Sequence, residues 1–175
     1  MNQPAAHTTS TPEHPAPYRV LFVCLGNICR SPAAEIVFDS LIRKAGLEQK
    51  IQADSAATSD YHIGDKPDRR MLAALEHEGY AWGGHLGRQL TRRDLETFDL
   101  IVPMDNTNLR DILALAGSGE HHARIMPMCS YVQNHPDREI PDPYYGGPDG
   151  FTHVIRLLED GCEHLLGTIS ESMHP

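Results

Sequence analysis

The sequence is short of cysteine, positive charge and long apolar runs, and each shortage excludes a class of protein. Four cysteines in 175 residues, Cys24, Cys29, Cys129 and Cys162, are too scattered for a disulfide scaffold or a zinc site. Basic residues number 15 against 24 acidic ones, and the formal net charge of −9 argues against nucleic acid or an anionic membrane as the main partner. No apolar run approaches the roughly 18 residues of a membrane-spanning helix. We therefore expect a soluble, cytoplasmic protein without a structural metal.

Length and the N-terminal composition predict one domain preceded by a tail. A chain of 175 residues can bury one sizeable core but is too short for two ordinary domains. Residues 1–17 have neither the basic start nor the apolar run of a secretory signal, and they are rich in Pro, Thr and Ala. We expect 1–17 to be a disordered tail and 18–175 to be a single domain.

Short β-rich runs alternate with helical segments along this domain. Strands are predicted at 18–24, 51–56, 98–105 and 123–127. Helical segments are predicted at 32–46, 67–79, 91–97, 105–116 and 150–170. Ser31 has the residue type of an N-cap for the first helix, and Gly46 is its stop. The alternation predicts the doubly wound α/β class, a parallel four-stranded sheet flanked by helices on both faces. Ligands of such folds bind at the carboxyl ends of strands, where Cys24 lies.

The segment C-L-G-N-I-C-R-S-P, residues 24–32, combines several devices for holding an anion beside a thiol. Gly26 and Asn27 tolerate a positive φ, so backbone N–H groups can point inward. The next helix directs its positive dipole end at the same space, and the planar fork of Arg30 matches phosphate oxygens. We therefore predict a phosphate loop after the first strand, with Cys24 as a largely ionised nucleophile. Its phosphate-binding residues are Leu25, Gly26, Asn27, Ile28, Cys29, Arg30 and Ser31.

Hydrolysis of a phosphate ester through a thiol also needs a proton for the leaving group and a base for water. One carboxyl group can do both, and several aspartates qualify on chemistry alone. Asp142 stands out because Pro141 and Pro143 stiffen its backbone within the long loop 129–150, and two tyrosines follow it. Without the cysteine loop, a surface turn would be the default interpretation of Asp142.

These motifs together carry a resemblance to a known family. CLGNICRSP resembles the signature of the low-molecular-weight protein tyrosine phosphatases. The resemblance continues, in the family's order, through DSAATSDYHIG (54–64), HLGRQL (85–90), FDLIVPMDNTNLRD (98–111) and IPDPYYGG (140–147). It covers nearly everything from Tyr18 onward. It implies hydrolysis of phosphotyrosine without metal or other cofactor, with Cys24 as nucleophile, Arg30 as phosphate clamp and Asp142 as general acid.

The resemblance also assigns supporting roles. It implies hydrogen-bonding support from Asn27, Ser31, Ser55, His85 and Asp105. It implies substrate-site walls formed by Tyr61, His62, Tyr144 and Tyr145. Cys29 matches the family's second loop cysteine, which suggests a reversible protective disulfide with Cys24, and packing beneath the loop is the alternative.

Two other activities share this fold and stay open. Arsenate reductases need further cysteines on a mobile segment near the loop, whereas Cys129 and Cys162 lie far along the chain. In the branch that dephosphorylates arginine, the position that Ile28 resembles is occupied by a Thr. The Ile at this position therefore favours phosphotyrosine as the substrate. A binding module without turnover has little support, because the nucleophile, the clamp and the acid are all present. The expected partners are phosphotyrosine proteins, with a cognate tyrosine kinase among the candidates, and we expect a monomer or a weak dimer.

Overall fold

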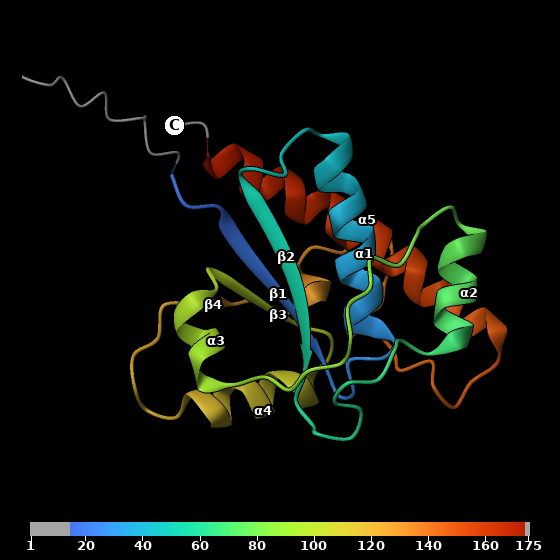
Figure 1. The fold of residues 1–175 in the computed structure, drawn as a ribbon, viewed down its shortest axis with the longest axis horizontal. Coiled ribbons are helices and arrows are strands. Elements are labelled where there is room, and N and C mark those ends of the chain that lie inside the picture. Colours follow the sequence, from blue (N-terminus) through green and yellow to red (C-terminus); the bar gives the residue numbers. More distant parts are fainter. Residues whose placement is uncertain (1–14, 174–175) are drawn as a thin grey trace, which may run out of the picture.

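Four parallel strands form one sheet in the order β2-β1-β3-β4 (Figure 1). They are β1 (Tyr18–Cys24), β2 (Ile51–Ala57), β3 (Leu100–Pro103) and β4 (Arg124–Ile125). The computed structural model describes residues 15–173, so most of the predicted tail 1–17 lies outside the described residues. The helices are α1 (Arg30–Lys44), α2 (Arg69–His77), α3 (Arg92–Thr97), α4 (Asn106–Ala116) and α5 (Pro148–Ser172), and a 3-10 turn, η1, spans Met128–Ser130. This arrangement confirms the predicted fold class.

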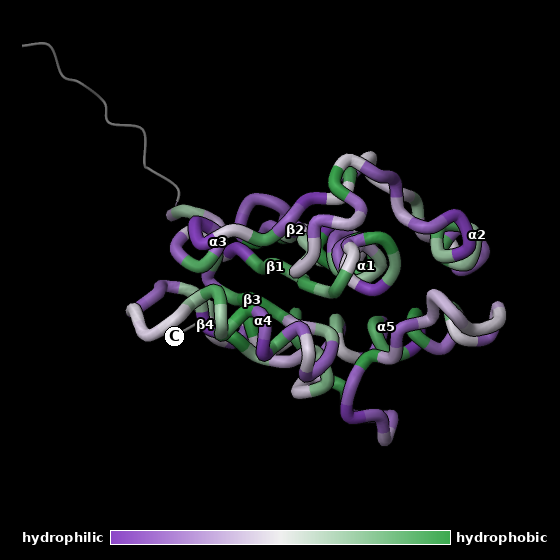
Figure 2. The backbone as a smooth tube through the Cα atoms, turned by 90° about the horizontal axis from the view of Figure 1, so that it is seen from below, coloured by the Kyte–Doolittle hydropathy of each residue, from purple (hydrophilic) through white to green (hydrophobic). Residues whose placement is uncertain are grey.

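The sheet is covered on both faces because β1 is apolar on both. Val20 and Phe22 face the layer that contains α1, α2 and α5, whereas Leu21 and Val23 face α3 and α4. The Phe22 ring meets Phe38 of α1 edge to face, with ring centroids 5.5 Å apart. Figure 2 shows hydrophobic segments at β1 and β3 in the middle of the molecule and hydrophilic ones mostly along its periphery. Within residues 15–173, no helix is long and apolar enough to cross a membrane.

The first helix begins earlier than the sequence predicts. Its N-cap is Cys29, and α1 already includes Arg30 and Ser31. The prediction that Ser31 caps the helix is therefore wrong. The reason is a competing partner, because the Ser31 hydroxyl lies 3.0 Å from the sulfur of Cys24.

Other element ends differ for similar reasons. The predicted strand 98–105 shrinks to β3, because Asp105 caps α4 by accepting a hydrogen bond from the Asn108 amide at 2.7 Å. β4 keeps only two residues of the predicted 123–127. Its pairing with β3 ends where Ile101 meets Ile125. Pro103 therefore lies beyond the last β3–β4 pair, where its missing N–H is not needed by the ladder.

Candidate active site

A pocket of about 170 Å³ opens at the carboxyl end of β1. Its walls come from the loop after β1, the segment after β2 and the loop before α5. It is lined by Cys24, Leu25, Gly26, Ile28, Cys29, Arg30, Tyr61, His62, Asp142, Tyr144 and Tyr145. The structure thus brings the candidate nucleophile, clamp, acid and aromatic walls into one space, although they are up to about 120 residues apart in the sequence.

The Cys24 sulfur is nearly buried and has two hydrogen-bonding neighbours. The Asn27 backbone N–H donates to Sγ at 3.3 Å, and the Ser31 hydroxyl lies 3.0 Å from Sγ. Asn27 has φ 56°, the one positive φ of a non-glycine residue within the described chain, and this turns its N–H toward the sulfur. Of the two residues that tolerate a positive φ, Asn27 adopts one and Gly26 does not. A Cβ at Gly26 would lie 3.1 Å from the ring of His62, so a larger residue there would need that ring to shift by a few tenths of an ångström.

Arg30 is held in place by oxygens on two other segments. Its Nη1 donates to Asp105 at 2.6 Å and to the carbonyl of Ile140 at 3.1 Å, and its Nη2 lies 3.5 Å from Asp142. Burial alone would lower the pKa of Arg30, but the charges of Cys24, Asp105 and Asp142 raise it overall. The guanidinium therefore stays charged beside the sulfur. Asp105, for which the resemblance implies a supporting role, contacts this clamp directly.

The side chain of Asn27 joins the other predicted supports. Its Nδ2 donates to the hydroxyls of Ser31 and Ser55 at 2.8 and 2.9 Å. Its Oδ1 accepts from Nε2 of His85 at 2.9 Å and from the backbone N–H of Arg88 at 3.1 Å. Asn27, Ser31 and Ser55 are fully buried, so these bonds form without competition from water. The phosphate loop is thereby fixed to β2 and to the segment 85–88.

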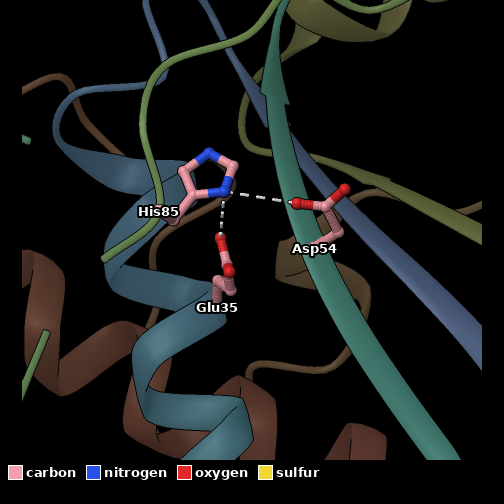
Figure 3. Close-up of side chains that lie close together, drawn as sticks. All are labelled: Glu35, Asp54 and His85. Atoms are coloured by element: carbon pink, nitrogen blue, oxygen red, sulfur yellow. Dashed lines mark ion pairs between the residues drawn. The ribbon is translucent and has the colours of Figure 1, made fainter. Parts of the chain in front are cut away.

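Sequence reasoning missed the charged groups behind this network. Figure 3 shows the ring of His85 between Glu35 of α1 and Asp54 of β2, with Nδ1 at 3.6 and 3.3 Å from their carboxylate oxygens. Burial alone would lower the pKa of His85, but the hydrogen bond to Asp54 and the two carboxylate charges raise it overall. Burial raises the pKa of Glu35, whereas His85 and Arg88 outweigh burial at Asp54 and lower its pKa. Both ring nitrogens of His85 face acceptors, an arrangement that favours the imidazolium form.

Glu35, Asp54 and His85 are also of metal-ligating types, and their ligand atoms lie within 4.8 Å of one another. Their contacts are nevertheless those of an ion-pair network. The Arg88 guanidinium donates to Asp54 at 2.9 Å, and the Ser55 hydroxyl donates to Glu35. The proton of His85 supplies the remaining positive charge. A site without metal therefore stays our prediction.

The remaining predicted residues lie at the pocket's rim or floor. Tyr61 and Tyr145 are 71% and 94% exposed, and Tyr144 meets Tyr145 edge to face. His62 is held by Asp65 at 3.0 Å. Burial raises the pKa of the Cys29 thiol, which makes Cys29 a poor nucleophile. All four cysteines are free thiols.

Comparison with known proteins agrees with this geometry. The family model described as low molecular weight phosphotyrosine protein phosphatase matches residues 19–174. A relative from Synechocystis sp. is 51% identical over 155 residues, which are 89% of this chain and 98% of the relative. A crystal structure of a protein tyrosine phosphatase from Entamoeba histolytica, with Hepes in its active site, superposes with a TM-score of 0.85 at 40% identity, covering 89% of this chain and 99% of that chain.

The same architecture occurs in a neighbour of different specificity. The crystal structure of a Drosophila arginine phosphatase superposes with a TM-score of 0.80 at 33% identity, covering 86% of this chain and 96% of that chain. The family match nevertheless spans nearly the whole described domain, and the relative from Synechocystis sp. is matched almost end to end. The chain therefore belongs to the low molecular weight phosphotyrosine protein phosphatase family.

Proposed function

We propose that this chain hydrolyses phosphotyrosine monoesters in proteins through a phosphocysteine intermediate, without a metal. The observation that carries the proposal is the shared pocket, in which the sulfur of Cys24, the guanidinium of Arg30 and the carboxyl group of Asp142 face the same space. Nucleophilic displacement at phosphorus needs these three functions: an anionic nucleophile, a fixed positive charge and a proton source.

In the first step the Cys24 thiolate attacks phosphorus in line. The S–P bond forms as the P–O bond to the tyrosine phenol breaks. Arg30, held by Asp105 and Ile140, stabilises the charge on the transferred oxygens together with the start of α1. Neutral Asp142 gives its proton to the departing phenolate.

In the second step Asp142, now a carboxylate, takes a proton from water. The water oxygen bonds to phosphorus while the S–P bond breaks, which releases phosphate and restores the thiolate. The Ser31 hydroxyl, 3.0 Å from the sulfur, donates to the departing thiolate and eases its release. Because the first step needs Cys24 ionised and Asp142 protonated, the rate should have a bell-shaped pH profile with a mildly acidic optimum.

The pocket walls support an aryl phosphate as the substrate. Tyr61, Tyr144 and Tyr145 offer ring surface at the rim, and Ile28 offers an apolar floor. Phosphoarginine is the second candidate, favoured by the likeness to the Drosophila arginine phosphatase. A guanidino leaving group carries several N–H donors, and the side chain of Ile28 accepts none of them. We therefore favour phosphotyrosine proteins as partners, with a cognate kinase among them.

Rapid-quench mass spectrometry with p-nitrophenyl phosphate tests the mechanism. Wild type and Asp142→Ala should both carry one phosphate on Cys24, and the adduct should accumulate in the variant because no base activates water. Cys24→Ser, the control, should carry none and should not turn over. Full turnover by Cys24→Ser, or phosphate on another residue, would contradict the proposal. Parallel assays with phosphotyrosine peptides, phosphoarginine and thiol-coupled arsenate separate the rival activities.

A further inference from the structure

The candidate acid lies on a segment that is anchored unevenly. Asp142 belongs to the stretch between η1 and α5, which has neither helix nor strand, and its side chain is 40% exposed. Before it, Ile140 is buried, and its amide donates to the carbonyl of Met104 at 2.9 Å. After it, the hydrogen bond from the Tyr144 amide to Asp142 at 3.1 Å lies within the segment itself. The direction of the Asp142 carboxyl group therefore depends on Arg30, whose Nη2 lies 3.5 Å from one oxygen, and on what holds Tyr144, whose amide donates to the other.

Arg70, in the first turn of α2, packs against the rings that follow the acid. Its guanidinium carbon lies 5.2 Å from the ring centroid of Tyr144 and 4.8 Å from that of Phe151. Phe151 is buried in the first turn of α5, so it is a rigid neighbour. A guanidinium over an aromatic face is attracted by the ring's quadrupole. Arg70 thus ties Tyr144 to the start of α5.

The same arginine is tied to the phosphate loop through Asp68. Its Nε and Nη2 donate to the two carboxylate oxygens of Asp68 at 3.1 and 2.9 Å. Asp68 also caps α2, and its backbone N–H donates to the carbonyl of Ile28 at 2.7 Å. The hydrogen bonds from Arg70 lower the pKa of Asp68, so the pair is ionised. A continuous set of contacts therefore runs from Ile28 of the phosphate loop to Tyr144 beside the acid.

We propose that Arg70 is a positioning residue for Asp142. By linking Asp68, which is bonded to the phosphate loop, with Tyr144 and Phe151, it sets the distance between the acid and the oxygen that leaves from phosphorus. The inference rests on the proposed function, in which Asp142 protonates that oxygen. A lysine cannot replace this arginine, because an ammonium group cannot form the planar fork with Asp68 while stacking on a ring.

The test is the dependence of kcat/KM on the leaving group. A series of aryl phosphates is assayed, from nitrophenols, which leave without a proton, to unsubstituted phenol, which needs one. Arg70→Met and Arg70→Lys should match wild type on the nitrophenyl esters and lose about tenfold to a hundredfold on phenyl phosphate, since a misplacement near 1 Å has effects of that size. Arg156→Met is the matched control, because Arg156 is about as exposed as Arg70 and also pairs with carboxylates, but its partners Glu78 and Glu159 belong neither to the phosphate loop nor to the segment of Asp142.

Asp142→Asn distinguishes the hypothesis that Asp142 is the general acid from the hypothesis that Arg70 positions it. If Asp142→Asn shows no dependence on the leaving group, the proposed acid itself is wrong. If kcat/KM of Asp142→Asn depends steeply on the leaving group while that of Arg70→Met depends on it as little as in wild type, the positioning role is overturned. An equal loss on every ester with a lower unfolding midpoint would assign Arg70 to stability alone. A raised KM for acidic phosphotyrosine peptides with a flat dependence would assign Arg70 to substrate binding, and either result overturns the inference.

Discussion

The side chain of Asn27 should be the main structural support of the phosphate loop, and Asn27→Gly isolates its contribution. Glycine accepts the φ of 56° without strain, so the substitution removes hydrogen bonds and leaves the turn in place. Four hydrogen bonds disappear, two donated to Ser31 and Ser55 and two accepted from His85 and Arg88.

The magnitude follows from which partners can find a substitute. The Ser31 hydroxyl already lies 3.4 Å from the carbonyl of Ala56, and the Ser55 hydroxyl already donates to Glu35, so these two groups lose little. The N–H of Arg88 loses its acceptor, whereas Nε2 of His85 keeps the Ser55 hydroxyl oxygen at 3.3 Å. One unsatisfied buried donor costs about 1–3 kcal/mol, so we expect a loss of about 2 kcal/mol. Relative to a total stability of about 5–15 kcal/mol, that is large.

Equilibrium urea unfolding measures this loss from the midpoint at an unchanged m value. Asn108→Ala is the control, because Asn108 is equally buried but its side-chain amide has no hydrogen-bond partner within the described residues. It should lose less than about 1 kcal/mol. Asn27→Ala should lose about 1–2 kcal/mol more than Asn27→Gly, because a Cβ disfavours the left-handed region. A loss below about 1 kcal/mol for Asn27→Gly, or equal losses for it and the control, would refute this reasoning.

The remaining predictions concern chemistry and pH. Asp142→Asn should slow phenyl phosphate about 10²- to 10⁴-fold and nitrophenyl esters far less, and equal losses would remove Asp142 from the acid role. Ser31→Ala should slow release from Cys24 about 10- to 100-fold, seen as a larger burst of p-nitrophenol, and an unchanged burst would contradict it. Because the pKa of His85 is raised on folding and that of Asp54 is lowered, their ion pair stabilises fully below pH ~6.5 and is lost as the pH rises through the raised value of His85. The urea midpoints of wild type and His85→Gln should therefore converge at alkaline pH, and a constant gap would contradict this. Peroxide should join Cys24 to Cys29 reversibly, whereas in Cys29→Ser mass spectrometry should find irreversible oxidation of Cys24, and equal recovery with dithiothreitol would contradict it.

The sequence predicts the elements well where local patterns and burial agree. The run YRVLFVC has apolar residues on both faces, and β1 is accordingly buried on both. Element ends are less predictable because a capping residue can have a better partner elsewhere. Ser31 contacts the sulfur of Cys24 instead of capping α1. Asp105, which the sequence pattern places in a strand, caps α4 and also binds Arg30. These choices depend on groups far away in the sequence.

The pocket lining was predictable because most of it lies in compact motifs, whereas its charged supports were not. Glu35 looks like an ordinary acid in the first turns of a helix, and Asp54 looks like an exposed strand residue. Their common partner, His85, comes from a loop about 30 or more residues later in the chain. No local pattern reports such pairs. The role of Arg70 could not be predicted for the same reason. Arg70 looks like an ordinary exposed residue at the start of a helix, and its packing on Tyr144 joins segments that are far apart in the sequence.

An acidic protein can present a positive site to a phosphate because two separate sets of contacts hold its charged groups. One set surrounds Arg30, and the other lies behind Asn27. Asp105 and Ile140 direct Arg30 toward the sulfur, and they supply the oxygens that keep this buried guanidinium charged. The network behind Asn27 ends in negatively charged groups instead. His85 and Arg88 neutralise these carboxylates away from the pocket. The net charge of −9 therefore has little bearing on the site, because the potential at the sulfur is dominated by the nearby groups of the same pocket, and distant surface charges are screened.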